Sequence, residues 1–186
     1  MTAVIVVIVL AVIVLVALGA WWYSRQHKTE VVREQFGSEY DRAVEQFGGD
    51  EQKATNALKD RQDRVEKVEI YPLSTEDRER YAEDWRSVQA QFVDDPGGAV
   101  NAADRLIADA MSRIGYPVDQ FEQREEAVSV KYPEVTGDYR KAHEIAQRNE
   151  AGDANTEDLR EAMVLYRGLF ERLIGMPQAS QAEATR

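Results

Sequence analysis

The most prominent pattern in the chain is a run of 21 apolar residues close to its N-terminal end. From Ala3 to Tyr23 the sequence reads AVIVVIVLAVIVLVALGAWWY, without a charged side chain. At about 1.5 Å of rise per residue, a helix of this length spans the roughly 30 Å hydrocarbon layer of a bilayer. Only a helix satisfies all backbone N–H and C=O groups of a single segment in lipid. The pattern therefore predicts one N-terminal transmembrane helix.

The residues that end this run are typical of a membrane interface. Trp21, Trp22 and Tyr23 are amphipathic aromatic residues that favour the headgroup level, and Arg25 and Lys28 follow them directly. Cations lie only on the C-terminal side of the run, so we expect the N-terminus outside and the following domain in the cytoplasm. A cleaved signal peptide is the alternative, but no cationic residue precedes the apolar run.

Residues 29–69 have short apolar patterns interrupted by glycine. Apolar residues recur at helical spacing on both sides of Gly37, which predicts two short helices with a break at this glycine. After Gly48 and Gly49, a highly charged segment carries a thin apolar seam. This seam consists of Ala54, Leu58, Val65 and Val68. We expect a charged juxtamembrane helical spacer over residues 29–69.

Residues 70–175 have the strongest helical periodicity after the N-terminal run. Tyr-Pro pairs at 71–72, 116–117 and 132–133 each precede a periodic segment, and proline is favoured at helix starts. Ser74, three residues before Asp77, is a candidate N-cap, and Asp119 with Glu122 suggests a second cap. Gly97 and Gly98 are expected in a turn between two helices that form an antiparallel hairpin.

No alternating strand pattern occurs, so the predicted fold class is all-α. We expect one N-terminal transmembrane helix, charged juxtamembrane helices and a compact bundle of about five short helices. The predicted organisation is an anchor with a cationic collar over residues 1–28, the spacer over 29–69, the bundle over 70–175 and a disordered tail over 176–186.

Composition narrows the range of functions. The chain has 186 residues, a formal net charge of −11 and no cysteine. A strongly acidic surface repels phosphate backbones, so nucleic acid is not an expected partner. Without cysteine there are no disulfides and no thiolate chemistry.

The residues that could carry chemistry are few. His27 and His143 are the only histidines, which excludes the paired Glu-x-x-His motifs of di-metal helical bundles. We interpret His143 as a half-buried structural residue, with a ligand or general base as the less favoured alternative. Residues 153–164 lack the glycine and the final glutamate of a calcium loop. We therefore expect no catalytic residue, no cofactor and no metal site. One group remains as a possible ligand pocket or simply core, and it consists of Tyr81, Trp85, Tyr116 and Tyr139.

Several segments resemble a group of uncharacterised, single-pass bacterial membrane proteins. They are REQFGSEYDRAVE, YAEDWRSVQAQFVDDPGGAV, IGYP, YRKAH and TEDLREAMVLYRGLFERL, and together the likeness covers nearly all of the chain after the apolar run. The resemblance implies a location in the bacterial plasma (inner) membrane with an uncleaved anchor. It implies no activity, cofactor or functional residue.

Our leading hypothesis is a membrane-tethered, non-enzymatic helical interaction or scaffold module, with the lipid bilayer and a protein as partners. The first alternative is a small-molecule sensor or enzyme with an aromatic pocket. The second is a homo-oligomeric stalk that associates through Leu58, Val65 and Val68.

Overall fold

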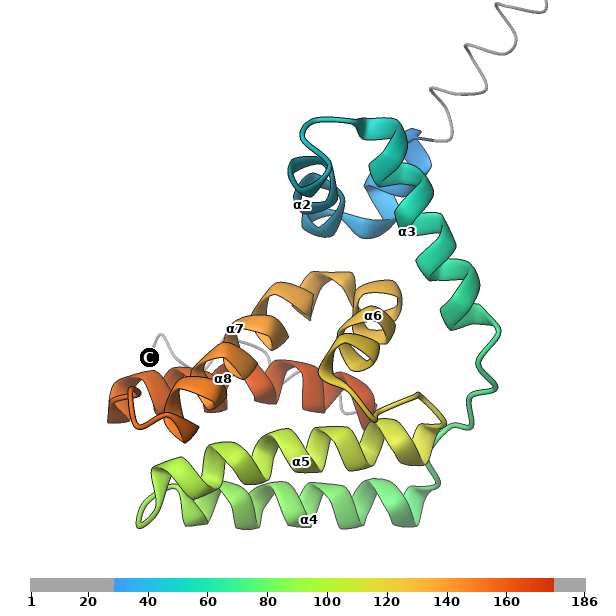
Figure 1. Ribbon diagram of the computed structural model, residues 1–186. Helices are drawn as coiled ribbons and strands as arrows, with labels where there is room; N and C mark the ends of the chain where they lie inside the picture. Colours follow the sequence, from blue (N-terminus) through green and yellow to red (C-terminus); the bar gives the residue numbers. More distant parts are fainter. Residues whose placement is uncertain (1–28, 176–186) are drawn as a thin grey trace, which may run out of the picture. The chain divides into compact units, whose positions relative to one another are not determined.

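The computed structural model describes residues 29–175, and their helices are labelled in Figure 1. This part of the chain contains helices and connecting turns, and no strand. It forms two compact units that divide between Asp60 and Arg61. The all-α prediction is therefore confirmed for residues 29–175. The division between the units falls inside a helix, so it does not test the predicted domain boundaries, which stay predictions.

The first unit follows the glycine pattern of the sequence. Residues 29–36 are helical, and Gly37 separates them from α2 (Ser38–Gln46) with a φ of 51°. Gly48 and Gly49 have φ values of 64° and 89° and connect α2 to α3 (Glu51–Glu66). The predicted break at Gly37 and the predicted turn at residues 48–49 are both confirmed. The largest buried side chains of this unit, each at most 2% exposed, are Val32, Phe36, Tyr40 and Leu58.

The second unit begins within α3 and continues through an extended segment into a helical hairpin. Tyr71 N donates to Ile114 O at 2.7 Å, which ties this extended segment to the end of α5. Ser74 then caps α4 (Thr75–Gln91), because its Oγ accepts from Asp77 N at 3.0 Å. The predicted cap is therefore confirmed. In Figure 1, α4 lies beside α5 (Pro96–Ile114) as the expected antiparallel hairpin.

The start of α5 differs from the expected glycine turn. Asp95 is the N-cap, Pro96 is the first helical residue, and Gly97 and Gly98 lie in the first turn of the helix. Asp95 Oδ1 accepts from Gly98 N at 2.9 Å. A Cβ atom on Gly98 would lie 1.9 Å from Asp95 Oδ2, so a larger residue there would force the capping carboxylate to move. The two glycines are part of a helix cap rather than of the connection.

Three further helices complete the second unit: α6 (Phe121–Lys131), α7 (Pro133–Glu150) and α8 (Thr156–Leu173). Each Tyr-Pro pair precedes a helix as predicted, but only Pro133 occupies a first helical position. The cap predicted from Asp119 and Glu122 is wrong, because Gln120 precedes α6 without a side-chain capping bond. Asn155 and Asp158 form a capping box at the start of α8.

The hydrophobic core of the second unit lies around α8, which packs against both α5 and α7 (Figure 1). Tyr81, Trp85, Val88 and Phe92 follow one another at spacings of four, three and four residues, which predicts a core face on this helix. The first three are buried and Phe92 is half-buried, and Trp85 stacks on Phe170 of α8 with ring centroids 4.6 Å apart. Helical spacing also predicts an apolar face on α8, and all of its residues are buried: Leu159, Met163, Tyr166, Phe170 and Leu173. Apolar periodicity therefore identified the core faces of these helices.

The predicted fold class needs one correction, which concerns the transmembrane helix. Of the helices in residues 29–175, none combines the length and the apolar character needed to cross a membrane. Residues 29–175 are therefore all-α, and the predicted transmembrane helix is not among their helices. The segment 3–23 and the predicted interface residues Trp21, Trp22, Tyr23, Arg25 and Lys28 lie outside the described residues. The tail predicted over residues 176–186 does too.

Candidate functional site

A buried polar cluster joins four helices of the second unit. It consists of Asp104 on α5, Arg124 on α6, Tyr139 and His143 on α7 and Tyr166 on α8. Arg124 Nη2 donates to Asp104 Oδ2 at 3.2 Å, and Tyr166 Oη donates to Asp104 Oδ1 at 3.0 Å. Arg124 Nε donates to Tyr139 Oη at 2.9 Å. Both carboxylate oxygens of Asp104 are thus occupied by protein donors.

The electrostatics of this cluster keep Asp104 ionised and the tyrosines neutral. Burial acts to raise the pKa of Asp104, but the contacts with His143, Arg124 and Tyr166 together hold it below its ordinary value. Burial is the largest cause that raises the pKa values of Tyr139 and Tyr166, and the Asp104 carboxylate raises them further, whereas the Arg124 guanidinium acts to lower them. Hydroxyls with raised pKa values are poor acids at neutral pH. These tyrosines therefore connect neighbouring helices through hydrogen bonds.

His143 lies at the edge of the cluster and has the half-buried position expected from the sequence. Its side chain is 17% exposed, and its ring stacks on Phe121 with centroids 3.7 Å apart. Its Nδ1 atom lies 3.6 Å from Asp104 Oδ1, beyond hydrogen-bonding distance. A polar pocket of about 90 Å³ adjoins it, lined by Asn101, Asp104, Arg105, His143, Ala146, Gln147 and Glu150. Residues 29–175 contain no group of acidic and histidine residues arranged to hold a metal.

Asp104 should make the protein sensitive to acid. A carboxyl whose folded pKa is depressed contributes stability above its unfolded pKa of about 3.9, and this contribution is lost as the pH falls through the lower folded value. We expect urea unfolding to show a larger loss of stability between pH 5 and pH 3 for the native chain than for Asp104→Asn. Other carboxyls are common to both proteins and cancel in this comparison. Equal losses would show that Asp104 is not held ionised by the fold.

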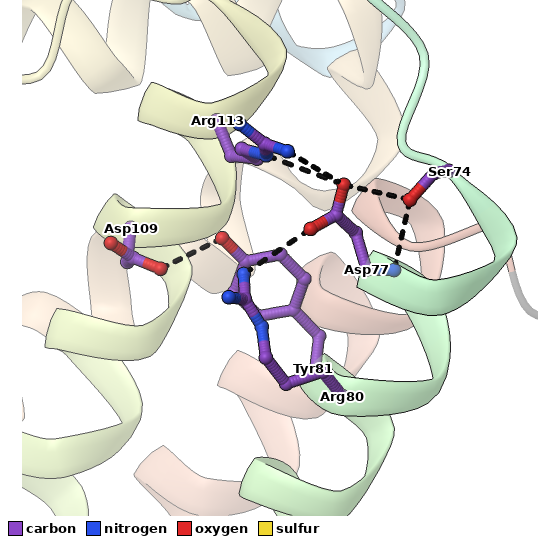
Figure 2. A network of polar contacts seen from close by, with 6 residues as sticks. All are labelled: Ser74, Asp77, Arg80, Tyr81, Asp109 and Arg113. Carbon is purple, nitrogen blue, oxygen red and sulfur yellow. Dashed lines mark hydrogen bonds and ion pairs between the residues drawn. The ribbon is translucent and has the colours of Figure 1, made fainter.

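A second polar network lies on the α4–α5 hairpin (Figure 2). Asp77 accepts from Ser74 Oγ at 2.8 Å and from Arg113 Nη2 at 3.1 Å. Tyr81 Oη donates to Asp109 Oδ2 at 2.7 Å. Burial first, and then Asp109, raises the pKa of Tyr81 to about 12, so its hydroxyl stays a donor at neutral pH. This network ties the start of α4 to the last turns of α5.

A pocket of about 200 Å³ lies beside α6, and we call it the α6 pocket. Its lining consists of Arg64, Val65, Val68, Tyr116, Pro117, Gln123, Glu126 and Ala127. All of these residues belong to the second unit. Arg64 Nε donates to Glu126 Oε1 at 2.7 Å, so the two charged groups of the lining are paired with each other. The remaining walls are mostly apolar.

One polar atom of this lining is not satisfied. Gln123 Oε1 is buried and has no hydrogen-bond partner among residues 29–175. Buried polar atoms are nearly always paired, because an unpaired one costs about 1–3 kcal/mol. Burial raises the pKa of Tyr116 to about 12, so its hydroxyl stays protonated. The lining of the α6 pocket is therefore mostly apolar, and the unpaired Gln123 oxygen is covered by protein atoms.

The four residues singled out as a possible pocket or core are all buried, but they do not line one cavity. Tyr116 lines the α6 pocket, whereas Tyr81 belongs to the α4–α5 network and Trp85 packs on Phe170. Tyr139 belongs to the buried polar cluster. Sequence patterns missed Gln123, Arg124 and Asp104, because each lies at a polar helical position that looks solvated.

The residues of the hypothetical stalk seam lie in different surroundings. Leu58 is 1% exposed and Val65 is 5% exposed in the single chain. Val65 and Val68 line the α6 pocket. Any docking partner that entered this pocket would contact these two residues.

Comparisons with known proteins do not assign the chain to a family. No family model matches the chain, and neither a curated protein nor a solved structure matches it.

Proposed function

We propose that the chain is a non-enzymatic helical interaction module that binds a partner protein through the α6 pocket. The observation that carries this proposal is the α6 pocket itself, whose walls are mostly apolar and whose residue Val68 is followed closely in the chain by exposed apolar residues. Ile70 and Tyr71 follow Val68 in the chain and are 44% and 56% exposed. Apolar patches of this kind on a polar surface are typical of binding sites.

The size of the pocket favours a side chain over a small-molecule ligand. Pockets for drug-sized ligands and cofactors measure roughly 300–1,000 Å³, and the α6 pocket of about 200 Å³ is smaller. A single large side chain is the kind of anchor that dominates protein interfaces. The ordinary ligand of this pocket is therefore proposed to be one residue of a protein partner.

The polar cluster is the weaker candidate for a functional site. Its carboxylate, guanidinium and hydroxyl groups bind one another, at distances of 2.9–3.2 Å. A reacting substrate would have to displace these bonds. We therefore assign this cluster to the stability of the bundle.

Site-specific photo-crosslinking tests the proposal. A benzophenone amino acid replaces the exposed Ile70, two residues after Val68 of the pocket lining, or Val164, which is 65% exposed on α8. In the cells that naturally make the full chain, position 70 should give one reproducible adduct that mass spectrometry identifies, and position 164 should not.

A filling substitution provides the control for this experiment. Val68→Trp should remove the adduct and weaken binding of the purified partner at least tenfold, whereas Val164→Trp should do neither. An adduct with a second copy of the chain would replace the proposal by self-association. An adduct that persists in Val68→Trp would show that the α6 pocket is not the docking site.

A further inference from the structure

We infer that the partner segment which docks at the α6 pocket carries one apolar anchor residue flanked by lysine or arginine. This inference rests on the proposed function and specifies the chemistry of its partner. The mostly apolar walls of the pocket select the anchor. The charged side chains beside the pocket select the residues on either side of that anchor.

The charge beside the α6 pocket is mainly acidic. The lining itself contributes no net charge, because Arg64 Nε donates to Glu126 Oε1 at 2.7 Å. Within two residues of the lining, Lys67 is the only cation without an ion pair among residues 29–175. Five exposed acidic residues within the same distance also have no ion pair there: Asp63, Glu66, Glu69, Asp119 and Glu122. A partner therefore approaches a local excess of negative charge.

Two of these acids are placed beside the pocket by the fold. Glu122 lies one helical turn before the lining residue Glu126 on α6, so the two side chains share a face of this helix. The backbone of Glu69 passes close to Gly115, where an added Cβ would lie 2.5 Å from the Glu69 carbonyl oxygen. Gly115 directly precedes Tyr116, another lining residue. The acidic excess is therefore local to the pocket in space as well as in the chain.

Charge complementarity separates basic flanks from the alternatives. A second copy of the chain carries the same net charge of −11 and is repelled, and so is an anionic lipid surface. A protein segment with acidic flanks meets the same repulsion, and one with neutral flanks gains no attraction. Basic flanks complement the acidic side chains, and such complementarity favours both specificity and rapid association.

Four short peptides with blocked ends test the inference on the full chain. Three have a central phenylalanine with two lysines, two glutamines or two glutamates on each side, and the fourth has lysines around a central alanine. NMR titration should show the lysine–phenylalanine peptide binding at least fivefold more tightly than the glutamine peptide. The glutamate and alanine peptides should bind more weakly still, and Val68→Trp should abolish the binding.

Matched double variants separate local charge from the net charge of the chain. Asp119→Asn with Glu122→Gln should weaken binding of the lysine–phenylalanine peptide at least threefold and leave the glutamine peptide unchanged. Asp84→Asn with Glu144→Gln removes the same two charges at exposed positions of α4 and α7. This control should leave both affinities unchanged.

Several outcomes would overturn the inference. They are equal affinity for the three charge variants of the peptide, a preference for the glutamate peptide, and no binding of any peptide. Equal losses in the two double variants would show attraction to the net charge alone, and undiminished binding of the alanine peptide would show that no anchor is used. In each case the crosslink at position 70 still decides independently whether the α6 pocket docks a protein.

Discussion

Arg124→Met is expected to lower the free energy of unfolding by about 3–5 kcal/mol, the cost of breaking a buried ion pair from one side. The side chains of Arg124 and Asp104 are only 11% and 20% exposed. Methionine keeps much of the apolar length of arginine but leaves the Asp104 carboxylate without its cation. Tyr139 and the Val118 carbonyl also lose a donor. Urea unfolding at pH 7, followed by circular dichroism, measures the change.

The control for this prediction is the same substitution in an exposed ion pair. Arg160 pairs with Glu157 on α8, and their side chains are 60% and 76% exposed. Arg160→Met should cost less than about 1 kcal/mol. If Arg124→Met costs no more than this control, the buried polar cluster does not hold the four helices together.

Gly115→Ala is expected to destabilise the second unit by about 2–5 kcal/mol, from backbone strain together with overpacking. Gly115 ends α5 with a φ of 110°, a conformation that disfavours any residue with a Cβ. The new Cβ would lie 2.5 Å from the backbone carbonyl oxygen of Glu69, which is less free to move than a side-chain tip. The hydrogen bond from Tyr71 N to Ile114 O holds the same segment in place. Chemical denaturation of the full chain measures this loss.

Gly137→Ala makes the same chemical change with the opposite expected sign. Gly137 lies inside α7, and apart from the adjacent backbone of its own helix no heavy atom of residues 29–175 would lie within 4 Å of its added Cβ. Alanine should stabilise the helix by about 0.5–1 kcal/mol. Destabilisation of similar size in both variants would contradict the conclusion that Gly115 is needed for its positive φ and for its close approach to the Glu69 backbone.

Local sequence signals predicted much of the bundle. The Ser74 cap, the breaks at Gly37 and Gly48–Gly49 and the apolar faces of α4 and α8 all appear where expected. These features depend on residues within a few positions of one another, so spacing alone can reveal them.

Two predictions were wrong because a short motif is compatible with more than one local structure. Gly97 and Gly98 resemble a turn, yet they sit in the first turn of α5 beneath the Asp95 cap. Asp119 resembles a cap, yet Gln120 takes that position. The transmembrane helix expected over residues 3–23 is a separate case. None of the helices in residues 29–175 is long and apolar enough to cross a membrane.

The sequence by itself determined the helical class, the main helix boundaries and which faces are buried, because apolar periodicity and capping act over one or two turns. Only the tertiary structure decided that Asp104 meets Arg124 and that segments around 65, 116 and 123 enclose one pocket. Asp104, Gln123 and Arg124 are ordinary surface positions by their own helical patterns, and the residues that they meet lie on other elements. Their partners are set by how the helices pack, which no local spacing records.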